Sequence, residues 1–323
     1  MPDTHINQYK FMKHKILIAA ALVIAATACT KKQLNTEADN PQATAELTVS
    51  LPQVITRASG EVDGGVNCFQ VFVFREDNKL EASSWGEETS QTLNLTKGIK
   101  KIAVLTNHDR INNVSDWNGL HSLTIDLSKN APEALLMFGE VTEELSVAKS
   151  IVVDVTRLAA RIELQTLTNA IALEPYKSQA MTLKRVFLIN VAGERNIAGT
   201  LSSWKWYNFG DFSTDACDAL LLNSTQKTLS AGVNTLDYAF YSYPNPDNEH
   251  PLRLVAEIEL GSEIWYYPVT IKNVEANKRY IVKGLKITRL GVKDPDQEIN
   301  FAEGTISIEV KPWTETEIEE VVI

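Results

Sequence analysis

Residues 45–51 read Ala-Glu-Leu-Thr-Val-Ser-Leu, and this stretch decides the fold class. Apolar and polar side chains alternate, which is the two-residue period of a strand with one buried face. The same alternation recurs over residues 252–260 and 305–310. More continuous apolar runs predict central strands at residues 68–74, 101–105 and 186–189, and residues 160–164 begin a second strand-rich block.

Turn residues separate these predicted strands at residues 76–78, 97–98, 192–193 and 244–248. Helical periodicity is weak throughout, and only residues 131–138 are expected to form one or two helical turns. Short strands with frequent turns predict an all-β chain of antiparallel sandwiches. The boundary is expected near residues 155–158, which divides the chain into an N-terminal sandwich (45–157) and a C-terminal sandwich (158–323).

A secretory leader precedes the first strand. Lys13 and Lys15 stand before an apolar run that is too short to span a membrane comfortably, and small residues lead up to Cys29. A cysteine in this position is typical of a bacterial lipoprotein signal. We therefore expect residues 1–28 to be a signal peptide, with Met12 as the true start.

In this interpretation Cys29 becomes the mature N-terminus and carries diacylglycerol and palmitate. Residues 29–44 are expected to be a lipidated, flexible tether, because residues 30–44 are polar. The precursor would then be a lipoprotein of the cell outer membrane. A buried apolar helix is the less favoured alternative, since polar residues follow Cys29 at once.

Composition excludes several classes of protein. The chain has 31 Lys and Arg against 41 Asp and Glu, a net charge of −10, and removal of the basic leader makes it more negative. This charge argues against a nucleic-acid partner, whose phosphates attract Lys and Arg. Only Cys68 and Cys217 remain after Cys29, and they are expected to be separate buried thiols, although a secreted protein would permit a disulfide.

No motif predicts catalysis. The mature chain holds three histidines, His108, His121 and His250, without the paired spacing of a zinc site. Nucleophile-elbow, phosphate-loop and dinucleotide-binding motifs are missing from the sequence. Residues 294–298 alternate carboxylates but lack the glycine and the later glutamate of a calcium loop, so a solvated loop is expected. We expect no catalytic residue, cofactor or metal, and no enzyme.

Two aromatic clusters offer an alternative function. They lie at residues 204–209 and 265–267. Exposed aromatic rings stack on sugars, so the alternative is a glycan-binding surface lipoprotein. Core or cross-strand packing is the more common use of such residues in sandwiches. The stacking residues would be Trp204, Trp206, Trp265 and Tyr266.

The segment after the first strand carries a candidate cleavage site. Residues 52–65 contain one Arg-Ala bond, between Arg57 and Ala58, among small and polar residues. Proteases cut preferentially in accessible loops of this kind. A cut there would separate the lipid and the strand at residues 46–51 from the rest of the chain.

The last residues read as a strand that needs a partner. Residues 305–310 alternate, and after Trp313 the sequence ends in Ile-Glu-Glu-Val-Val-Ile at 318–323. An unpaired apolar strand promotes association. Addition to a sheet of another subunit would use it, because backbone hydrogen bonds supply affinity and alternate side chains fill pockets.

At this point the chain resembles the fimbrillin family, the FimA-like major subunits of type V pili. Besides the leader and Arg57-Ala58, the matching segments are residues 71–74, 101–107, 135–140, 155–162, 277–280 and 308–313. The resemblance spans nearly the whole mature chain. It rests on the order of the motifs, since each is short.

The resemblance implies two transthyretin-like β-sandwiches behind a lipidated leader. An Arg-specific protease would cleave after Arg57 and displace the first strand, with Leu47, Val49 and Leu51 on its apolar face. The C-terminal strand of a neighbouring subunit would fill the vacated groove. The donor residues implied for this chain are Trp313, Ile318, Val321 and Ile323.

The implied partners are copies of this chain or other pilin subunits, in an extracellular fimbria that supports adhesion to a host or bacterial surface ligand. The acidic residues at 315–320 leave the donor register open. A shaft, tip or anchor subunit of the same pilus is equally compatible with these motifs, and the ligand is not specified by them.

Overall fold

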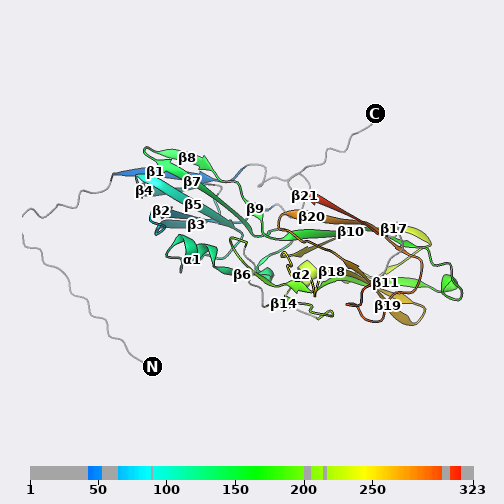
Figure 1. Cartoon of the computed structure of the whole chain (residues 1–323). Helices are drawn as coiled ribbons and strands as arrows, with labels where there is room; N and C mark the ends of the chain where they lie inside the picture. Colours follow the sequence, from blue (N-terminus) through cyan, green and yellow to red (C-terminus); the bar gives the residue numbers. More distant parts are fainter. Residues whose placement is uncertain are drawn as a thin grey trace, which may run out of the picture. The chain divides into compact units, whose positions relative to one another are not determined.

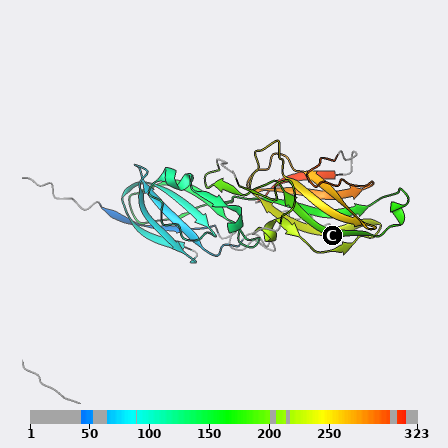
Figure 2. The same ribbon diagram turned by 90° about the horizontal axis from the view of Figure 1, so that it is seen from below.

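The computed structural model describes residues 43–52, 65–88, 90–199, 205–213, 217–299 and 306–313. These residues form mostly β-structure arranged in several sheets, which confirms the expected β-rich fold. The described residues make up one compact unit. Strands of residues 44–157, apart from residues 124–126, gather in one group, and strands of residues 160–312 gather in another (Figures 1 and 2).

The first group contains two sheets. Three strands form one sheet in the order β4-β1-β8, and five form the other in the order β3-β2-β5-β7-β9. Their bounds are β1 (Thr44–Ser50), β2 (Phe69–Arg75), β3 (Leu80–Gly86), β4 (Ser90–Thr96), β5 (Gly98–Thr106), β7 (Met137–Leu145), β8 (Lys149–Val152) and β9 (Thr156–Arg157).

The second group also contains two principal sheets. Their orders are β17-β10-β20-β21 and β15-β11-β18-β19, with β16 pairing beside β15 on β11. Their bounds are β10 (Ala160–Asn169), β11 (Met181–Ile189), β15 (Leu222–Asn223), β16 (Lys227–Thr228), β17 (Gly232–Ser242), β18 (Arg253–Leu260), β19 (Glu263–Thr270), β20 (Lys278–Ile287) and β21 (Ile306–Pro312).

Short elements complete the described fold. Two pairs of short strands, β12 with β14 and β13 with β6, lie outside the four main sheets. Their bounds, with those of the helical turns, are β6 (Thr124–Asp126), β12 (Val191–Ala192), β13 (Glu194–Asn196), β14 (Trp206–Tyr207), α1 (Trp117–His121), α2 (Asp218–Leu221), η3 (Leu127–Lys129) and η4 (Tyr176–Ser178).

The two groups repeat one connectivity. β1 lies between antiparallel β4 and parallel β8, and β10 lies in the same way between antiparallel β17 and parallel β20. The row β2-β5-β7 corresponds to β11-β18-β19, since both are consecutive antiparallel pairs. The groups differ at one edge. β21 pairs with the outer edge of β20, whereas no described strand pairs with the outer edge of β8.

The most apolar strands are buried on both faces, which explains their continuous sequence pattern. Along β2, Val71 and Val73 point into one hydrophobic cluster, and Phe72 and Phe74 point into another. A strand with a single buried face would alternate instead. The continuous run at residues 68–74 therefore marks a central strand, as predicted.

Two local predictions were wrong. Residues 131–138 do not form a helix: the Ala134 amide donates to the Ala131 carbonyl (3.0 Å), and β7 starts at Met137. The apolar residues of this stretch are instead buried in a turn and at the beginning of β7. Residues 192–193 are not a turn either, because Gly193 connects β12 directly to β13 and donates its amide to the Lys205 carbonyl (2.8 Å).

Candidate functional site

β1 is the central strand of its sheet. It pairs with β4 over seven residues, from Thr44 opposite Thr96 to Ser50 opposite Ser90. On its other side it pairs in parallel with β8, from Leu47 opposite Lys149 to Ser50 opposite Val152. β1 thus lies between β4 and β8 (Figure 1). Its removal would expose two backbone edges and leave a groove between these strands.

The inner face of β1 fills this groove. Leu47, Val49 and Leu51 are 1%, 0% and 8% exposed and belong to one hydrophobic cluster with side chains of β2, β4, β5, β7 and β8. Alternation in the sequence predicted this arrangement. The floor contacted by β1 is formed by Phe69, Val71, Val73, Leu93, Leu95, Ile102, Val104, Met137, Leu145, Ile151, Val153 and Val155.

The polar side chains of β1 reinforce its edges. The hydroxyl groups of Thr48 and Thr92 form a hydrogen bond with each other (3.0 Å). The Ser50 hydroxyl donates a hydrogen bond to the Ile151 carbonyl (3.2 Å). Next to the strand, the Val153 amide donates to the Ser50 carbonyl (3.0 Å). β1 is thus bound on both sides by neighbours that belong to the rest of the chain.

A buried ion pair closes the groove at the Thr44 end. The Lys100 ammonium donates to Glu81 (2.6 Å) and to the Thr96 hydroxyl (2.9 Å), and its side chain is only 3% exposed. Burial raises the pKa of Glu81, but hydrogen bonds from Lys100 and Thr96 outweigh burial, so the pKa of Glu81 is lowered. The pair holds β3, β4 and β5 together where β1 begins.

Several predicted site residues lie outside the described residues. They are Cys29, Arg57, Ala58, Trp204, Ile318, Val321 and Ile323, together with the leader, the tether and the acidic run at 315–320. Arg57 belongs to the segment that connects Pro52, just after β1, to Gly65, just before β2. The displaced-strand residues and Trp313 are described.

Trp313 fixes the end of β21. It is 3% exposed, its ring stacks on Tyr241 with 6.1 Å between centroids, and the Arg157 guanidinium lies 4.5 Å above it. The Trp313 amide also donates to the Asn277 carbonyl (3.3 Å). These contacts join the last described residue to β9, β17 and the start of β20.

β21 itself carries exposed apolar residues. Ile308 and Val310 are 37% and 55% exposed, although they share a face with buried Val282 and Tyr280 of β20. On the other face Lys283 and Lys311 bind Glu309 at 2.8 and 3.4 Å. β21 is therefore a charged and partly apolar edge strand.

The aromatic clusters divide into packed and exposed rings. Tyr207 and Tyr267 are buried, and the Lys293 ammonium lies 3.5 Å above the centroid of the Trp265 ring, which blocks that face from stacking. Phe209 is 53% exposed and lies 5.6 Å from the Trp206 ring and 4.8 Å from the His250 ring. We call Trp206, Phe209 and His250 the aromatic platform.

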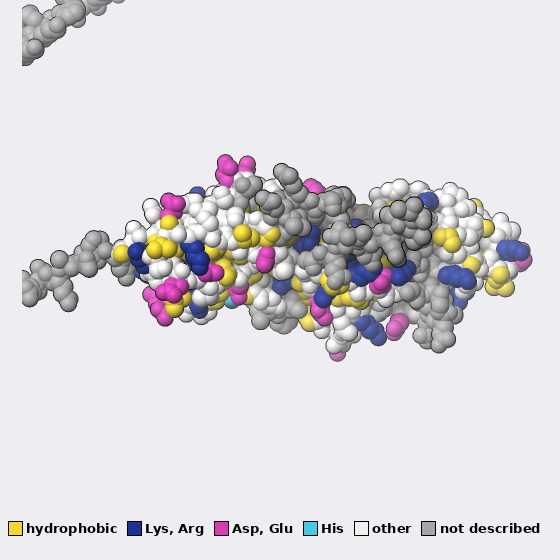
Figure 3. Space-filling model, turned by 90° about the horizontal axis from the view of Figure 1, so that it is seen from above, with side chains coloured by type: hydrophobic (Ala, Val, Ile, Leu, Met, Phe, Trp, Pro, Cys, Tyr) yellow, Lys and Arg dark blue, Asp and Glu magenta, His cyan; other side chains and the backbone are white. Residues whose placement is uncertain are grey.

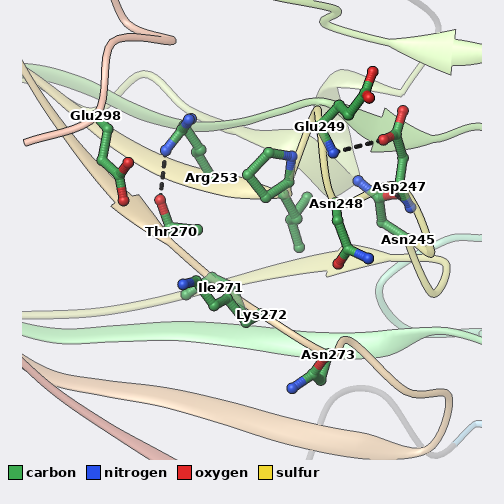
Figure 4. Close-up of a pocket in the computed structure, with 12 residues that line it drawn as sticks. Asn245, Asp247, Asn248, Glu249, Arg253, Thr270, Ile271, Lys272, Asn273 and Glu298 are labelled. Carbon is green, nitrogen blue, oxygen red and sulfur yellow. Dashed lines mark hydrogen bonds between the residues drawn. The ribbon is translucent and has the colours of Figure 1, made fainter.

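A polar cavity of about 300 Å³ lies beside the segment that carries His250. Its walls come from residues 245–253, from the end of β19 and residues 271–273, and from Glu298 (Figure 4). Arg253 and Thr270 lie on one side, and Asp247, Asn248 and Glu249 lie on the other. This cavity was not predicted from the sequence, because residues 244–248 indicated only a turn.

A second polar network joins the two strand groups. Asp126 accepts hydrogen bonds from the Tyr207 hydroxyl (2.7 Å), from the Ser128 amide (2.8 Å) and from Lys205. Burial raises the pKa of Asp126, but these hydrogen bonds outweigh burial and lower it to about 2. The carboxylate therefore remains charged and holds β6 against β14.

Other expectations about chemistry can be placed on the structure. Among the described residues, neither Cys68 nor Cys217 forms a disulfide; Cys217 is buried as expected, whereas Cys68 is only partly buried. Asp296 of the acidic loop is not simply solvated, because it accepts hydrogen bonds from Arg253 and Asn190, each at 2.8 Å. Within the described ranges, no cluster of three or more His, Cys, Asp or Glu is placed to bind a metal ion.

The surface and the helices add two observations. On the face drawn in Figure 3, Lys and Arg side chains are interspersed with Asp and Glu. Among the residues whose placement is given, no helix has the length and apolar character needed to cross a bilayer.

Comparison with known proteins gives a family match over part of the chain. Residues 45–173 match the model of the major fimbrial subunit protein FimA. No curated protein matches this chain at a significant level.

Solved structures share the fold. A fimbrilin, FimA, from Porphyromonas gingivalis superposes with a TM-score of 0.60 at 16% identity, over 83% of this chain and 97% of that one. A protein described as a cell adhesion protein of Bacteroides eggerthii superposes with a TM-score of 0.63 at 19% identity, over 84% of this chain and 97% of that one. A protein with the same description from Parabacteroides distasonis superposes with a TM-score of 0.57 at 16% identity, over 84% of this chain and 98% of that one. Identities this low show a common fold.

The matched region contains β1 except Thr44, both neighbours of β1 and every residue of the groove floor. The family consists of structural subunits of fimbriae rather than of enzymes. Residues 45–173 of this chain match the family model of the FimA major fimbrial subunits, in agreement with the resemblance found in the sequence motifs.

Proposed function

We propose that this chain is a structural pilin of a type V fimbria that polymerises by donor-strand exchange and supports adhesion. Two transthyretin-like sandwiches, residues 45–157 and 158–323, would follow the leader at residues 1–28. The precursor would be acylated at Cys29 and trimmed after Arg57. The observation that carries this proposal is the position of β1, buried between β4 and β8 and joined to β2 through the segment that holds Arg57.

The burial of β1 makes the vacated groove a strong binding site. Full burial of one aliphatic side chain contributes roughly 1.5–3 kcal/mol. Leu47, Val49 and Leu51 are all nearly or fully buried, and β1 also bonds to strands on both sides. Loss of β1 would expose this apolar floor and two unpaired edges to water, so an incoming strand would regain most of that stabilisation.

Cleavage at Arg57 would break the covalent connection between β1 and β2. After the cut, only noncovalent contacts would hold β1 in the sheet. A donor strand could then compete for the same two edges, which is the physical basis of strand addition. The lipid on Cys29 would leave with β1, and this would free the subunit from the outer membrane.

The proposed donor follows Trp313. Val321 and Ile323 have the two-residue spacing of Leu47 and Val49, so a regular strand would place both in the groove. Ile318 has the opposite parity and would face outward in that register. The contacts of Trp313 with Arg157 and Tyr241 would keep the donor subunit folded while the residues after it bind a neighbour.

Proteolysis of the full chain tests the trimming step. An Arg-specific protease is expected to produce a stable core whose new N-terminus is Ala58. The matched control, Arg57→Ala, is expected to remain uncut in the segment between β1 and β2. Rapid degradation of the whole chain, or a stable core that starts elsewhere in the wild type, would contradict this step.

A further inference from the structure

The polar cavity beside residues 245–253 contains a buried cation with an uncommitted donor. The Arg253 side chain is 9% exposed. Its Nε donates to Asp296 (2.8 Å) and its Nη1 donates to the Thr270 hydroxyl (Figure 4). Nη2 makes no hydrogen bond to any residue that the structure describes. The guanidinium is thus held rigidly, with one donor group still available.

The opposite wall is also held in place. Asp247 accepts hydrogen bonds from the Glu249 amide (2.8 Å) and binds the His250 ring at 3.0 Å. The hydrogen bond from His250 is the main cause of the lowered pKa of Asp247. The Asn245 amide group donates to the Asn190 and His250 carbonyls at 3.0 and 2.8 Å. The wall therefore keeps its shape without a ligand.

The charges around the cavity favour a neutral ligand. Four carboxylates line or brace it, from Asp247, Glu249, Asp296 and Glu298, against the two cations of Arg253 and Lys272. An anionic ligand would meet excess negative charge, and Arg253 is already paired. The cavity nevertheless offers both donors and acceptors, the combination that hydroxyl groups require.

The aromatic platform adjoins this cavity through one residue. Asp247 lines the cavity and binds the ring of His250, and that ring contacts exposed Phe209. Sugar rings have an apolar face that packs on aromatic rings and a polar edge that forms hydrogen bonds, so an aromatic surface next to a polar cavity suits them. Small-molecule sites commonly combine apolar contacts with a few fixed polar groups.

We infer that the cavity and the aromatic platform together form a binding site for a neutral saccharide. Arg253, Thr270 and Asp247 would hydrogen-bond its hydroxyl groups, and Phe209 would pack against a ring. Of the stacking residues expected from the sequence, this inference keeps Trp206, and Phe209 takes the place of Trp265 and Tyr266. It does not depend on polymerisation, because all of these residues lie in one chain.

Binding of defined oligosaccharides to the purified full chain tests this inference. The probes are maltotetraose and lacto-N-tetraose as neutral sugars, with a sialylated lacto-N-tetraose as the acidic counterpart, measured by saturation-transfer NMR and titration. We expect saturable binding of at least one neutral probe with a dissociation constant below 10 mM, on the order of that expected for a few hydrogen bonds and one stacked ring. Sialylation is expected to weaken it.

Variants locate the site. Arg253→Gln and the exposed substitutions Phe209→Ser and Lys272→Ala are expected to weaken binding at least about threefold, and the last two keep the test valid if Arg253→Gln unfolds. Trp265→Phe is the matched aromatic control and should bind as the wild type does. No binding of either neutral probe, preference for the acidic probe, or unchanged binding by Phe209→Ser and Lys272→Ala would overturn the inference.

Discussion

The Arg157 guanidinium lies over the indole ring of Trp313, 4.5 Å from its centroid, so the end of β21 is bound to a residue of β9. Tyr241 stacks on the same ring at an interplanar angle of 17°. The point where the proposed donor segment leaves the folded subunit is therefore fixed by two aromatic rings and a cation. This arrangement suits a subunit that must stay folded while its C-terminal residues bind elsewhere.

Substitution of Trp313 is expected to release β21. Trp313→Ala removes a buried ring, a change that costs about 3–5 kcal/mol in free energy of unfolding. Denaturant unfolding measures this loss, and hydrogen exchange should show faster exchange in β21 than in β10. Val310→Ala is the control, because this side chain is 55% exposed and should change stability by less than about 0.5 kcal/mol. Equal effects of both substitutions would argue against an anchor at Trp313.

Leu47 is expected to stabilise the precursor and not the trimmed subunit. Leu47→Ala should lower the free energy of unfolding of the intact chain by about 2–5 kcal/mol, because a buried leucine is truncated. After cleavage at Arg57 and removal of β1, the variant and the wild type should be identical in stability. Glu46→Ala, on the exposed face of β1, is the control that should change little in either form. A persistent difference after trimming would mean that β1 is retained.

Asp126 is expected to contribute stability that is lost in acid. Its pKa falls from 3.8 to about 2 on folding, which corresponds to roughly 2 kcal/mol. Because the folded pKa is the lower one, this stabilisation is complete above pH 4 or so and disappears as the pH falls towards 2. Asp126→Asn should therefore be less stable than the wild type at neutral pH, and the difference should narrow across that window.

The control for Asp126 is an exposed carboxylate in a surface ion pair. Asp109 lies 3.4 Å from Lys129, and its side chain is 84% exposed. Asp109→Asn should change the free energy of unfolding by less than about 1 kcal/mol at any pH. Thermal unfolding of the three proteins at several pH values compares them directly. A constant gap between Asp126→Asn and the wild type from pH 5 to pH 2 would contradict the assignment.

Gly139 is expected to tolerate no side chain. A Cβ atom there would lie 1.9 Å from the Asp154 carbonyl oxygen, so the backbone of one strand would have to move. Gly139→Ala should lower the free energy of unfolding by at least about 1–3 kcal/mol, the usual cost of overpacking. At Gly86 the closest atom would be 3.6 Å away, and Gly86→Ala should be neutral or slightly stabilising. Comparable losses at both positions would contradict the steric explanation.

Much of the fold could be predicted from hydrophobic periodicity. Alternation located β1, β18 and β21, and continuous apolar runs located β2 and β5, because those strands are buried on both faces. Periodicity does not report strand order, so the parallel pairs β1-β8 and β10-β20 were not predicted. The helix expected at residues 131–138 failed because Ala134, Leu135 and Leu136 are buried by a turn rather than by a helical face.

The candidate sites were predictable to different degrees. Leu47, Val49 and Leu51 could be named because a single strand carries them in alternation. The saccharide site could not, because its residues come from separate segments that meet only in the fold. Arg253 looked like one polar residue of an alternating strand, and Phe209 looked like part of an aromatic run. The contact between the Lys293 ammonium and the Trp265 ring could not be predicted either, because the two residues lie 28 positions apart in the sequence.

Polymerisation after trimming tests the central claim most directly. The full chain and a version truncated after Trp313 are both cut with an Arg-specific protease and then examined by mass spectrometry and electron microscopy. The account predicts that the trimmed full chain, starting at Ala58, forms filaments, while the trimmed truncated version stays monomeric. A trimmed core that remains monomeric with its C-terminus intact, or filaments from the truncated version, would contradict donor-strand exchange.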